Sequence, residues 1–265
     1  MANSQTQAQE GTIGSKKCWA SCIGGCFNKI SREHTVTRAM FLDKEITVSG
    51  LPWCAGEPKN VGLANLTAKV LCVVHNSALS EVDQEAVRFA EAMRESFRLL
   101  AVRQSLKPRR WTIRRFPVDG QRMERWFLKT LINVGCRCGS PIGPDSHHRG
   151  LPSNSLVEIA FGRRKFEPNA GLYGIYDDPE NRPYMDGISI HAFNTTENRV
   201  AGAVFSFLGF RLLLFLDRKG PPPLTEVSAA TGETTEMIEP TYHPRGIEYL
   251  AGKSTSHLLE FKWPA

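Results

Sequence analysis

The sequence lacks three features that would each assign it to a large class of proteins. The first 14 residues are polar and contain no apolar segment of the kind found in a secretory leader. The most apolar run, VAGAVFSFLGFRLLLFL at 200–216, has 17 residues and contains Arg211, so it is short for a membrane span and better suited to two buried strands. Residues 108–265 contain no nucleotide-binding glycine motif. We therefore expect a cytoplasmic protein without a membrane segment, with a disordered tail over residues 1–14.

The charge is unevenly distributed along the chain. Among 265 residues, 41% are hydrophobic and 23% are charged, which is enough apolar material for a core, and the formal net charge is +6. Residues 107–129 alone carry eight positive side chains against two negative ones, which equals the whole excess. Such a segment can contact a phosphate backbone, and it can equally be a solvated surface. The candidate phosphate contacts within it are Arg109, Arg110, Arg114 and Arg115.

Cysteine is the residue that most constrains the first part of the chain. There are seven cysteines, and without a secretory leader their clustering suggests a metal site more than disulfides. Cys22 and Cys26 form one pair, and Cys72 and His75 form a second pair 45 residues later. Zinc prefers four nitrogen or sulfur ligands in a tetrahedron, so we predict a structural zinc ion on these four residues. Cys18 is an alternative to one of the first two cysteines, and Cys54, which lies further along, is a weaker substitute.

The remaining pattern predicts an α+β protein in two parts. Ser80 begins an amphipathic helix, with Ser80 and Asp83 as a capping box. A second helix is expected over 121–134, with Gly135 as its C-terminal cap. Strands are expected in SLVEIAF, GLYGIY, GISIHAF, VAGAVFSF and FRLLLFL, between residues 155 and 216. We expect a small zinc-stabilised domain over 15–106 and a larger strand-rich α+β domain over 107–265.

The order of residues in the first part resembles a known family. A cysteine pair is followed by Glu33–His34 in "SREH", and then by "LCVVHN", which holds the second zinc pair and Asn76. This order is similar to the zinc-bracketed form of the HNH endonucleases, which have a ββα-metal core, and the similarity covers about residues 18–90. The family's middle Asn falls on Thr67, and its usual Asp is Glu33, one methylene longer.

The resemblance implies roles for three residues. His34 would be the general base that takes a proton from the attacking water. Glu33 and Asn76 would hold one catalytic ion, Mg²⁺ or Mn²⁺, through oxygen ligands. The expected activity is hydrolysis of phosphodiester bonds in DNA, with RNA as the less favoured substrate, and a homodimer is compatible with the sequence.

Two alternatives remain open at this level. In the first, the chain is a non-catalytic, zinc-containing nucleic-acid-binding module, in which Glu33–His34 is incidental. In the second, the chain is a scaffold whose function lies in residues 107–265, a part in which we recognise no family. Convergence of Glu33, His34 and Asn76 would separate the endonuclease from the binding module.

Overall fold

The structure is a computed structural model that describes residues 18–27, 29–54, 56–107, 109–146, 150–175, 187–195, 197–222, 224–227 and 234–264. The tail predicted over residues 1–14 lies outside these residues. The described chain is an α+β protein with mixed sheets, as predicted.

The first part builds a small strand-strand-helix unit. Strand β1 (Glu33–His34) pairs antiparallel with β4 (Thr67–Ala68), and helix α1 (Val73–Ala78) follows. Short 3-10 turns fill the connections: η1 (Ser21–Ile23), η2 (Arg38–Met40), η3 (Pro52–Cys54) and η4 (Leu63–Asn65). Backbone hydrogen bonds extend the pairing beyond β1, because Ser31 N donates to Leu71 O and Val73 N donates to Lys29 O.

Helix α2 (Ser80–Gln104) confirms the apolar stripe predicted from the sequence. Of the six residues of this stripe, Val82, Ala86, Phe89, Met93 and Leu100 are buried and Phe97 is partly buried, in keeping with their helical spacing.

The predicted capping box is wrong. Leu79 precedes the helix and no side chain caps its first turn. Helix α1 ends at Ala78, two residues before the first residue of α2, so the turn between the helices leaves no room for a separate capping motif. Asp83 instead accepts a hydrogen bond from Thr37 Oγ1 at 2.6 Å.

A seven-stranded sheet contains strands from both halves of the sequence. Its order is β12 (Thr241–Tyr242), β6 (Gly171–Ile175), β9 (Phe210–Phe215), β8 (Val200–Phe207), β7 (Gly187–Asn194), β2 (Glu45–Ser49) and β3 (Lys59–Gly62). Strand β2 runs parallel to β7, with Val48 opposite Ile188. The residues of 15–106 and of 107–265 thus share one sheet, and one cluster of buried apolar residues spans both.

The apolar run at 200–216 forms the antiparallel strands β8 and β9, as predicted. They are joined by a tight turn in which Leu208 and Gly209 both have positive φ. In the part of the chain that the structure describes, no helix has the length and apolar character needed to cross a membrane.

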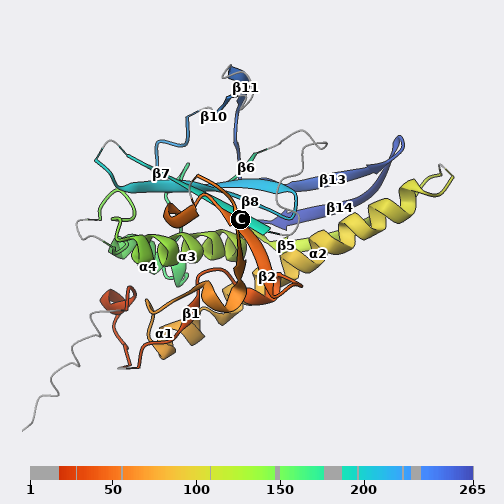
Figure 1. Ribbon diagram of the computed structural model, residues 1–265. Helices are drawn as coiled ribbons and strands as arrows, with labels where there is room; N and C mark the ends of the chain where they lie inside the picture. The colour runs from red at the N-terminus through yellow and green to blue at the C-terminus, as the bar shows by residue number, and fades with distance from the viewer. Residues whose placement is uncertain are drawn as a thin grey trace, which may run out of the picture.

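A second, three-stranded sheet supports the long helix. It has the order β13 (Gly246–Ala251), β14 (Ser254–Lys262) and β5 (Arg114–Asp119), and β14 is parallel to β5. A separate pair consists of β10 (Leu224–Val227) and β11 (Thr234–Ile238). Helix α2 contacts β13, β14 and β5 and runs below the β13–β14 hairpin, and α3 contacts strands of both sheets, β8 and β9 as well as β5 and β14 (Figure 1).

Two helices differ from the prediction. Helix α3 (Gly120–Cys138) continues past Gly135 and ends at Gly139, whose φ of 75° gives the left-handed cap. Gly135 lies inside the helix, close to Ile142: a Cβ there would lie 2.5 Å from Ile142 Cδ1, so a larger residue would require that side chain to shift. The segment SLVEIAF, predicted as a strand, lies mostly in α4 (Asn154–Ala160), since a short apolar run does not distinguish a buried helix from a strand.

Candidate metal centre

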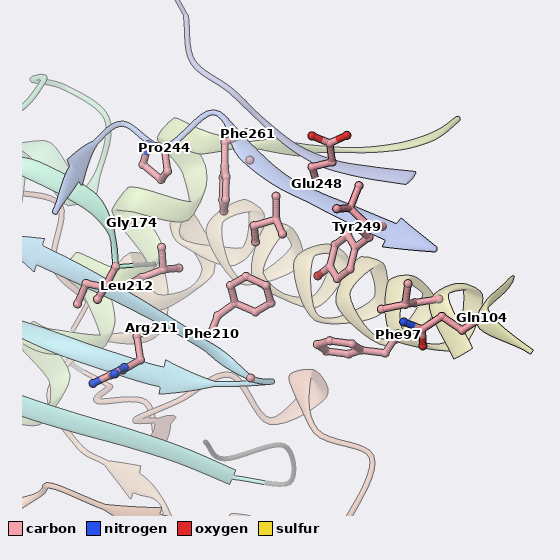
Figure 2. Close-up of a pocket in the computed structure, with 16 residues that line it drawn as sticks. Phe97, Gln104, Gly174, Phe210, Arg211, Leu212, Pro244, Glu248, Tyr249 and Phe261 are labelled. Carbon is pink, nitrogen blue, oxygen red and sulfur yellow. The ribbon is translucent and has the colours of Figure 1, made fainter. Parts of the chain in front are cut away.

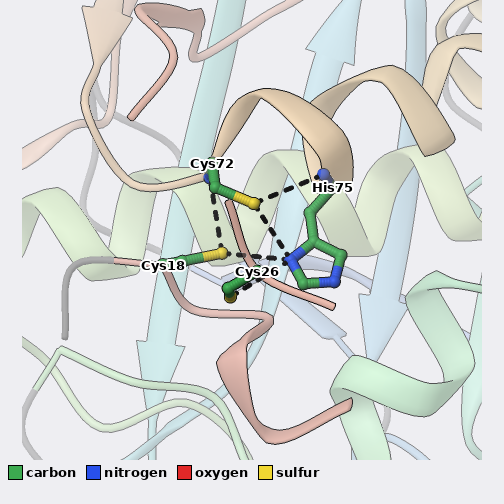
Figure 3. Close-up of side chains that lie close together, drawn as sticks. All are labelled: Cys18, Cys26, Cys72 and His75. Carbon is green, nitrogen blue, oxygen red and sulfur yellow. Dashed lines mark hydrogen bonds between the residues drawn. The ribbon is translucent and has the colours of Figure 1, made fainter. Parts of the chain in front are cut away.

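Three thiols and one imidazole converge beside the strand-strand-helix unit. Their ligating atoms, on Cys18, Cys26, Cys72 and His75, all lie within 4.8 Å of one another, and only Cys26 is partly exposed (Figure 3). Nδ1 of His75 is 3.3 Å from Cys18 Sγ, 3.6 Å from Cys26 Sγ and 3.3 Å from Cys72 Sγ. The chain therefore contains a buried Cys₃His group compatible with a structural zinc site.

The distances agree with the size of a zinc tetrahedron. With Zn–S near 2.3 Å and Zn–N near 2.05 Å at tetrahedral angles, each sulfur would lie about 3.6 Å from the nitrogen. One of the three observed distances equals this value and the other two are 0.3 Å shorter. The set of donors is also one that zinc prefers, because thiolates and imidazole are its usual ligands in structural sites.

The backbone fixes the ligands from two separate segments. Cys72 is the N-cap of α1, where its sulfur accepts from His75 N at 3.5 Å, so the helix start sets the spacing of this pair. The Cys72 N–H in turn approaches Cys18 Sγ at 3.4 Å. Trp19 N donates to Val70 O, which holds the first segment alongside the second.

The larger part of the chain packs against the same centre. Trp19 Nε1 donates to Asn133 Oδ1 of α3 at 3.1 Å. Phe161, at the end of α4, makes edge contacts with both Trp19 and His75, at centroid distances of 5.7 and 5.4 Å. The Cys₃His group therefore ties the N-terminal segment to helices α3 and α4 as well as to α1.

The environment sets the protonation of the free ligands. Burial lowers the pKa of His75, against a hydrogen bond with the Gly24 backbone, so the imidazole is neutral and able to ligate at neutral pH. Burial raises the pKa of Cys18 to about 12. Burial also acts to raise the pKa of Cys72. Hydrogen bonds from the backbone of His75 and Phe27 outweigh this effect, so the pKa of Cys72 is lowered. Metal binding would therefore release protons, at Cys18 above all.

Cys22, predicted as a ligand, lies outside the group. It is exposed on η1, whereas Cys18 is 1% exposed and stands in its place, which is the alternative that the sequence left open. Cys54 is buried in η3 and is not part of the group. The sequence signal for Cys18 was its neighbour Trp19, a large apolar residue that anchors this end of the segment in the core.

Glu33 is held in a buried charge cluster that the sequence did not predict. Its Oε1 is 2.7 Å from Nζ of Lys129 on α3, and the same ammonium lies 2.6 Å from Asp83 Oδ2 on α2. The side chains of Lys129 and Glu33 are 3% and 9% exposed. Lys129 belongs to the basic segment 107–129, but its side chain is buried, because it lies on the face of α3 that packs against the core, between two carboxylates.

His34 and Asn76 lie apart from this charge cluster. Neighbouring residues of a strand point to opposite faces, so His34 lies on the other side of β1 from the buried Glu33, and it is partly exposed. Asn76 follows the ligand His75 on α1, and its Nδ2 donates to Ser31 Oγ at 3.1 Å. Its Oδ1 is buried and has no hydrogen-bond partner among the described residues. Glu33 is thus bound to Lys129, whereas Asn76 is bound to Ser31.

The predicted phosphate contacts divide into two pairs. Arg114 lies 3.0 Å from Glu95 and over the ring of Phe116, and Arg115 pairs with Glu260. Arg109 stacks over Trp111 at 4.5 Å, and Arg110 is exposed without an ion pair to a described residue. Among the described residues, no carboxylate pairs with Arg109 or Arg110.

A cavity of about 390 Å³ lies away from these residues, between α2, β9 and β13 (Figure 2). The rings of Phe97, Phe210 and Tyr249 face it, and the guanidinium of Arg211 points away from them. The lining is mainly apolar and contains none of the metal ligands.

No family model matches the sequence, and no curated protein or solved structure matches it either.

Proposed function

We propose that the chain is a zinc-containing, metal-dependent endonuclease of the HNH type that hydrolyses phosphodiester bonds in DNA. The zinc would be held by Cys18, Cys26, Cys72 and His75, in a position that joins the segment 18–26 to the start of α1, next to the β1–β4 pair. This is the strand-strand-helix order of a ββα-metal core, with His34 on the strand and Asn76 on the helix.

The observation that carries the proposal is the buried Oδ1 of Asn76. A buried amide oxygen without a partner costs free energy unless something donates to it or coordinates it. A hard divalent cation such as Mg²⁺ or Mn²⁺ takes oxygen ligands of this kind. Such an ion would stabilise charge on the scissile phosphate and on the departing oxygen.

The residues of the chain have separate tasks in this proposal. His34, partly exposed on β1, takes the proton of the attacking water. Ser31 orients the amide of Asn76 through its hydroxyl. Arg109 and Arg110 contact the DNA backbone, because neither makes an ion pair with a described carboxylate.

The test is nicking of a supercoiled plasmid by the purified chain, with and without added Mg²⁺ or Mn²⁺, together with elemental analysis for zinc. His34→Ala should abolish nicking while zinc remains bound. His191→Ala is the matched control, because His191 is an exposed strand histidine that lies on β7. Nicking that persists in His34→Ala would refute the assigned base.

A second function is favoured by the buried charge cluster. Because the carboxylate of Glu33 forms an ion pair with the ammonium of Lys129, strand β1 offers no free acidic side chain to a catalytic ion. That arrangement favours a non-catalytic, zinc-containing module that binds nucleic acid. Salt-sensitive DNA binding without nicking under any added metal would support it. In Arg110→Ala the fall of log K with log salt should then become less steep by about 0.9, the contribution of one phosphate contact.

A further inference from the structure

A second cavity, of about 350 Å³, lies at the opposite end of helix α3 from its cap at Gly139. It is bounded by the start of α3, by the segment 164–169 after α4, and by residues near the end of the described chain. Its volume is at the lower end of the range for small-molecule sites, which suits a ligand of one ring system with a substituent.

One wall of this cavity is aromatic. The ring of His243 stacks on Tyr242 and on Trp263, with both centroid distances 3.9 Å and interplanar angles of 17° and 6°. His243 has a φ of 44°, an unfavourable backbone conformation that the two ring contacts and the hydrogen bond to Glu124 hold in place. Tyr242 is 37% exposed and Phe166 extends the wall on the side of α4. His243 is covered on both faces and Gly120 lies against the ring of Trp263, so a planar ligand would stack on the exposed parts of Tyr242 and Phe166.

The rest of the lining carries an excess of positive charge. The lining contains three cationic side chains, Arg125, Arg164 and Lys165. Glu124 is the one acidic residue among the described lining residues. Glu124 Oε1 already accepts from Leu172 N at 2.8 Å and lies 3.2 Å from His243 Nε2.

The three cations are not equally available to a ligand. Arg125 is anchored by its Nε to Ala160 O, and Arg164 pairs with Glu167 at the exposed rim. Lys165 is exposed and makes no ion pair with a described residue. With Glu124 and Glu167 both counted against the three cations, one net positive charge remains, and Lys165 is the cation whose charge a phosphate could neutralise.

We infer that this cavity binds a phosphorylated nucleoside, with the base against the aromatic wall and the phosphate at Lys165, Arg164 and Arg125. The ligand is either a free mononucleotide or the terminal nucleotide of a 5′-phosphorylated strand. The inference uses none of the metal ligands, nor His34 or Asn76, and so does not depend on the proposed nuclease activity.

Isothermal titration calorimetry of the full chain tests the inference with five probes: AMP, a short 5′-phosphorylated single strand, adenosine, ribose 5-phosphate and inorganic phosphate. AMP or the strand should bind, and the probes that lack the base or the phosphate should bind at least about tenfold more weakly, as expected for the loss of one base stack. If the strand binds and AMP does not, the site holds a strand end, and the reverse result identifies a free nucleotide.

Variants decide whether binding occurs in this cavity. Lys165→Ala and Tyr242→Leu should each weaken binding at least about fivefold, because they remove an exposed cation and a stacking ring. Lys253→Ala, in the turn between β13 and β14, is the matched control and should bind like the wild type. The inference is overturned if neither AMP nor the strand binds, if ribose 5-phosphate binds as tightly as AMP, or if the two variants bind unchanged.

Discussion

The sharpest prediction concerns the choice between two cysteines four residues apart. Cys18→Ser removes a buried ligand whose sulfur lies 3.3 Å from His75 Nδ1, whereas Cys22→Ser changes an exposed thiol outside the group. Serine is close to cysteine in size but does not form a thiolate, so the comparison isolates coordination from packing. We expect about one zinc atom per wild-type chain and per Cys22→Ser chain, and almost none in Cys18→Ser.

The expected effect on stability is large. Zinc that binds only the folded state contributes about 10–16 kcal/mol in zinc-finger peptides, while whole domains are stable by about 5–15 kcal/mol. Here the ion would also hold Trp19 on α3 and Phe161 on His75, so its loss loosens contacts with both helices. If only about 5 kcal/mol is lost, the melting temperature should fall by more than about 10 °C. Cys22→Ser should stay within about 2 °C of the wild type.

The assay is elemental analysis of the purified variants together with thermal unfolding, before and after treatment of the wild type with a chelator. Chelation should reproduce the Cys18→Ser melting temperature, since both remove the same ion. A wild-type protein without zinc, or a Cys22→Ser protein that loses zinc while Cys18→Ser keeps it, would refute the ligand set.

Three further predictions address the core. Replacing Lys129 by Met leaves two carboxylates without their shared cation and should lower the free energy of unfolding by about 3–5 kcal/mol, measured by urea denaturation. Burial lowers the pKa of His257 to about 4, with the nearby positive charges of two arginines acting in the same direction. As pH falls below about 6.5 the unfolded chain takes up a proton that the folded chain does not, so stability should drop by about 3 kcal/mol by pH 4. His257→Phe should remove this part of the pH dependence in denaturation at pH 7 and pH 5. A Cβ at Gly187 would lie 2.3 Å from a backbone oxygen of β2, so Gly187→Ala should destabilise by about 2 kcal/mol where Gly56→Ala, in open space, should not.

Periodicity was sufficient for the elements with a long apolar pattern. The helix from Ser80 and the two strands at 200–216 follow directly from their spacing, because each buries one face or both faces over many residues. Short elements gave no such signal. Leu156, Val157 and Ile159 fit a strand or one turn of helix equally well, and tertiary packing selects the helix α4.

A site of three cysteines and one histidine could be predicted from the sequence, but which cysteines belong to it was harder to predict. The spacing of Cys72 and His75 identifies them as one ligand pair, because residues i and i+3 at the start of a helix lie on the same side of that helix. Cys22 has the usual spacing to Cys26, whereas seven residues separate Cys18 from Cys26, so spacing favours Cys22 and only burial, set by Trp19 and α3, favours Cys18. The role of Lys129 could not be predicted, since a lysine amid arginines gives no sign that it turns inward to meet Glu33 from 96 residues away.

The two faces of β1 restrict any chemistry that the metal centre could support. Glu33 faces the core, where Lys129 and Asp83 complete a charge cluster that also includes Thr37 as a donor to Asp83. Freeing Glu33 for a cation would leave the ammonium with one carboxylate in a buried position, which is costly. A catalytic ion would therefore be held by Asn76 without Glu33, with phosphate oxygens and water as the remaining ligands. Such an ion would bind weakly without substrate, so added Mg²⁺ should bind only when DNA is present, and tight Mg²⁺ binding to the free chain would argue against this arrangement.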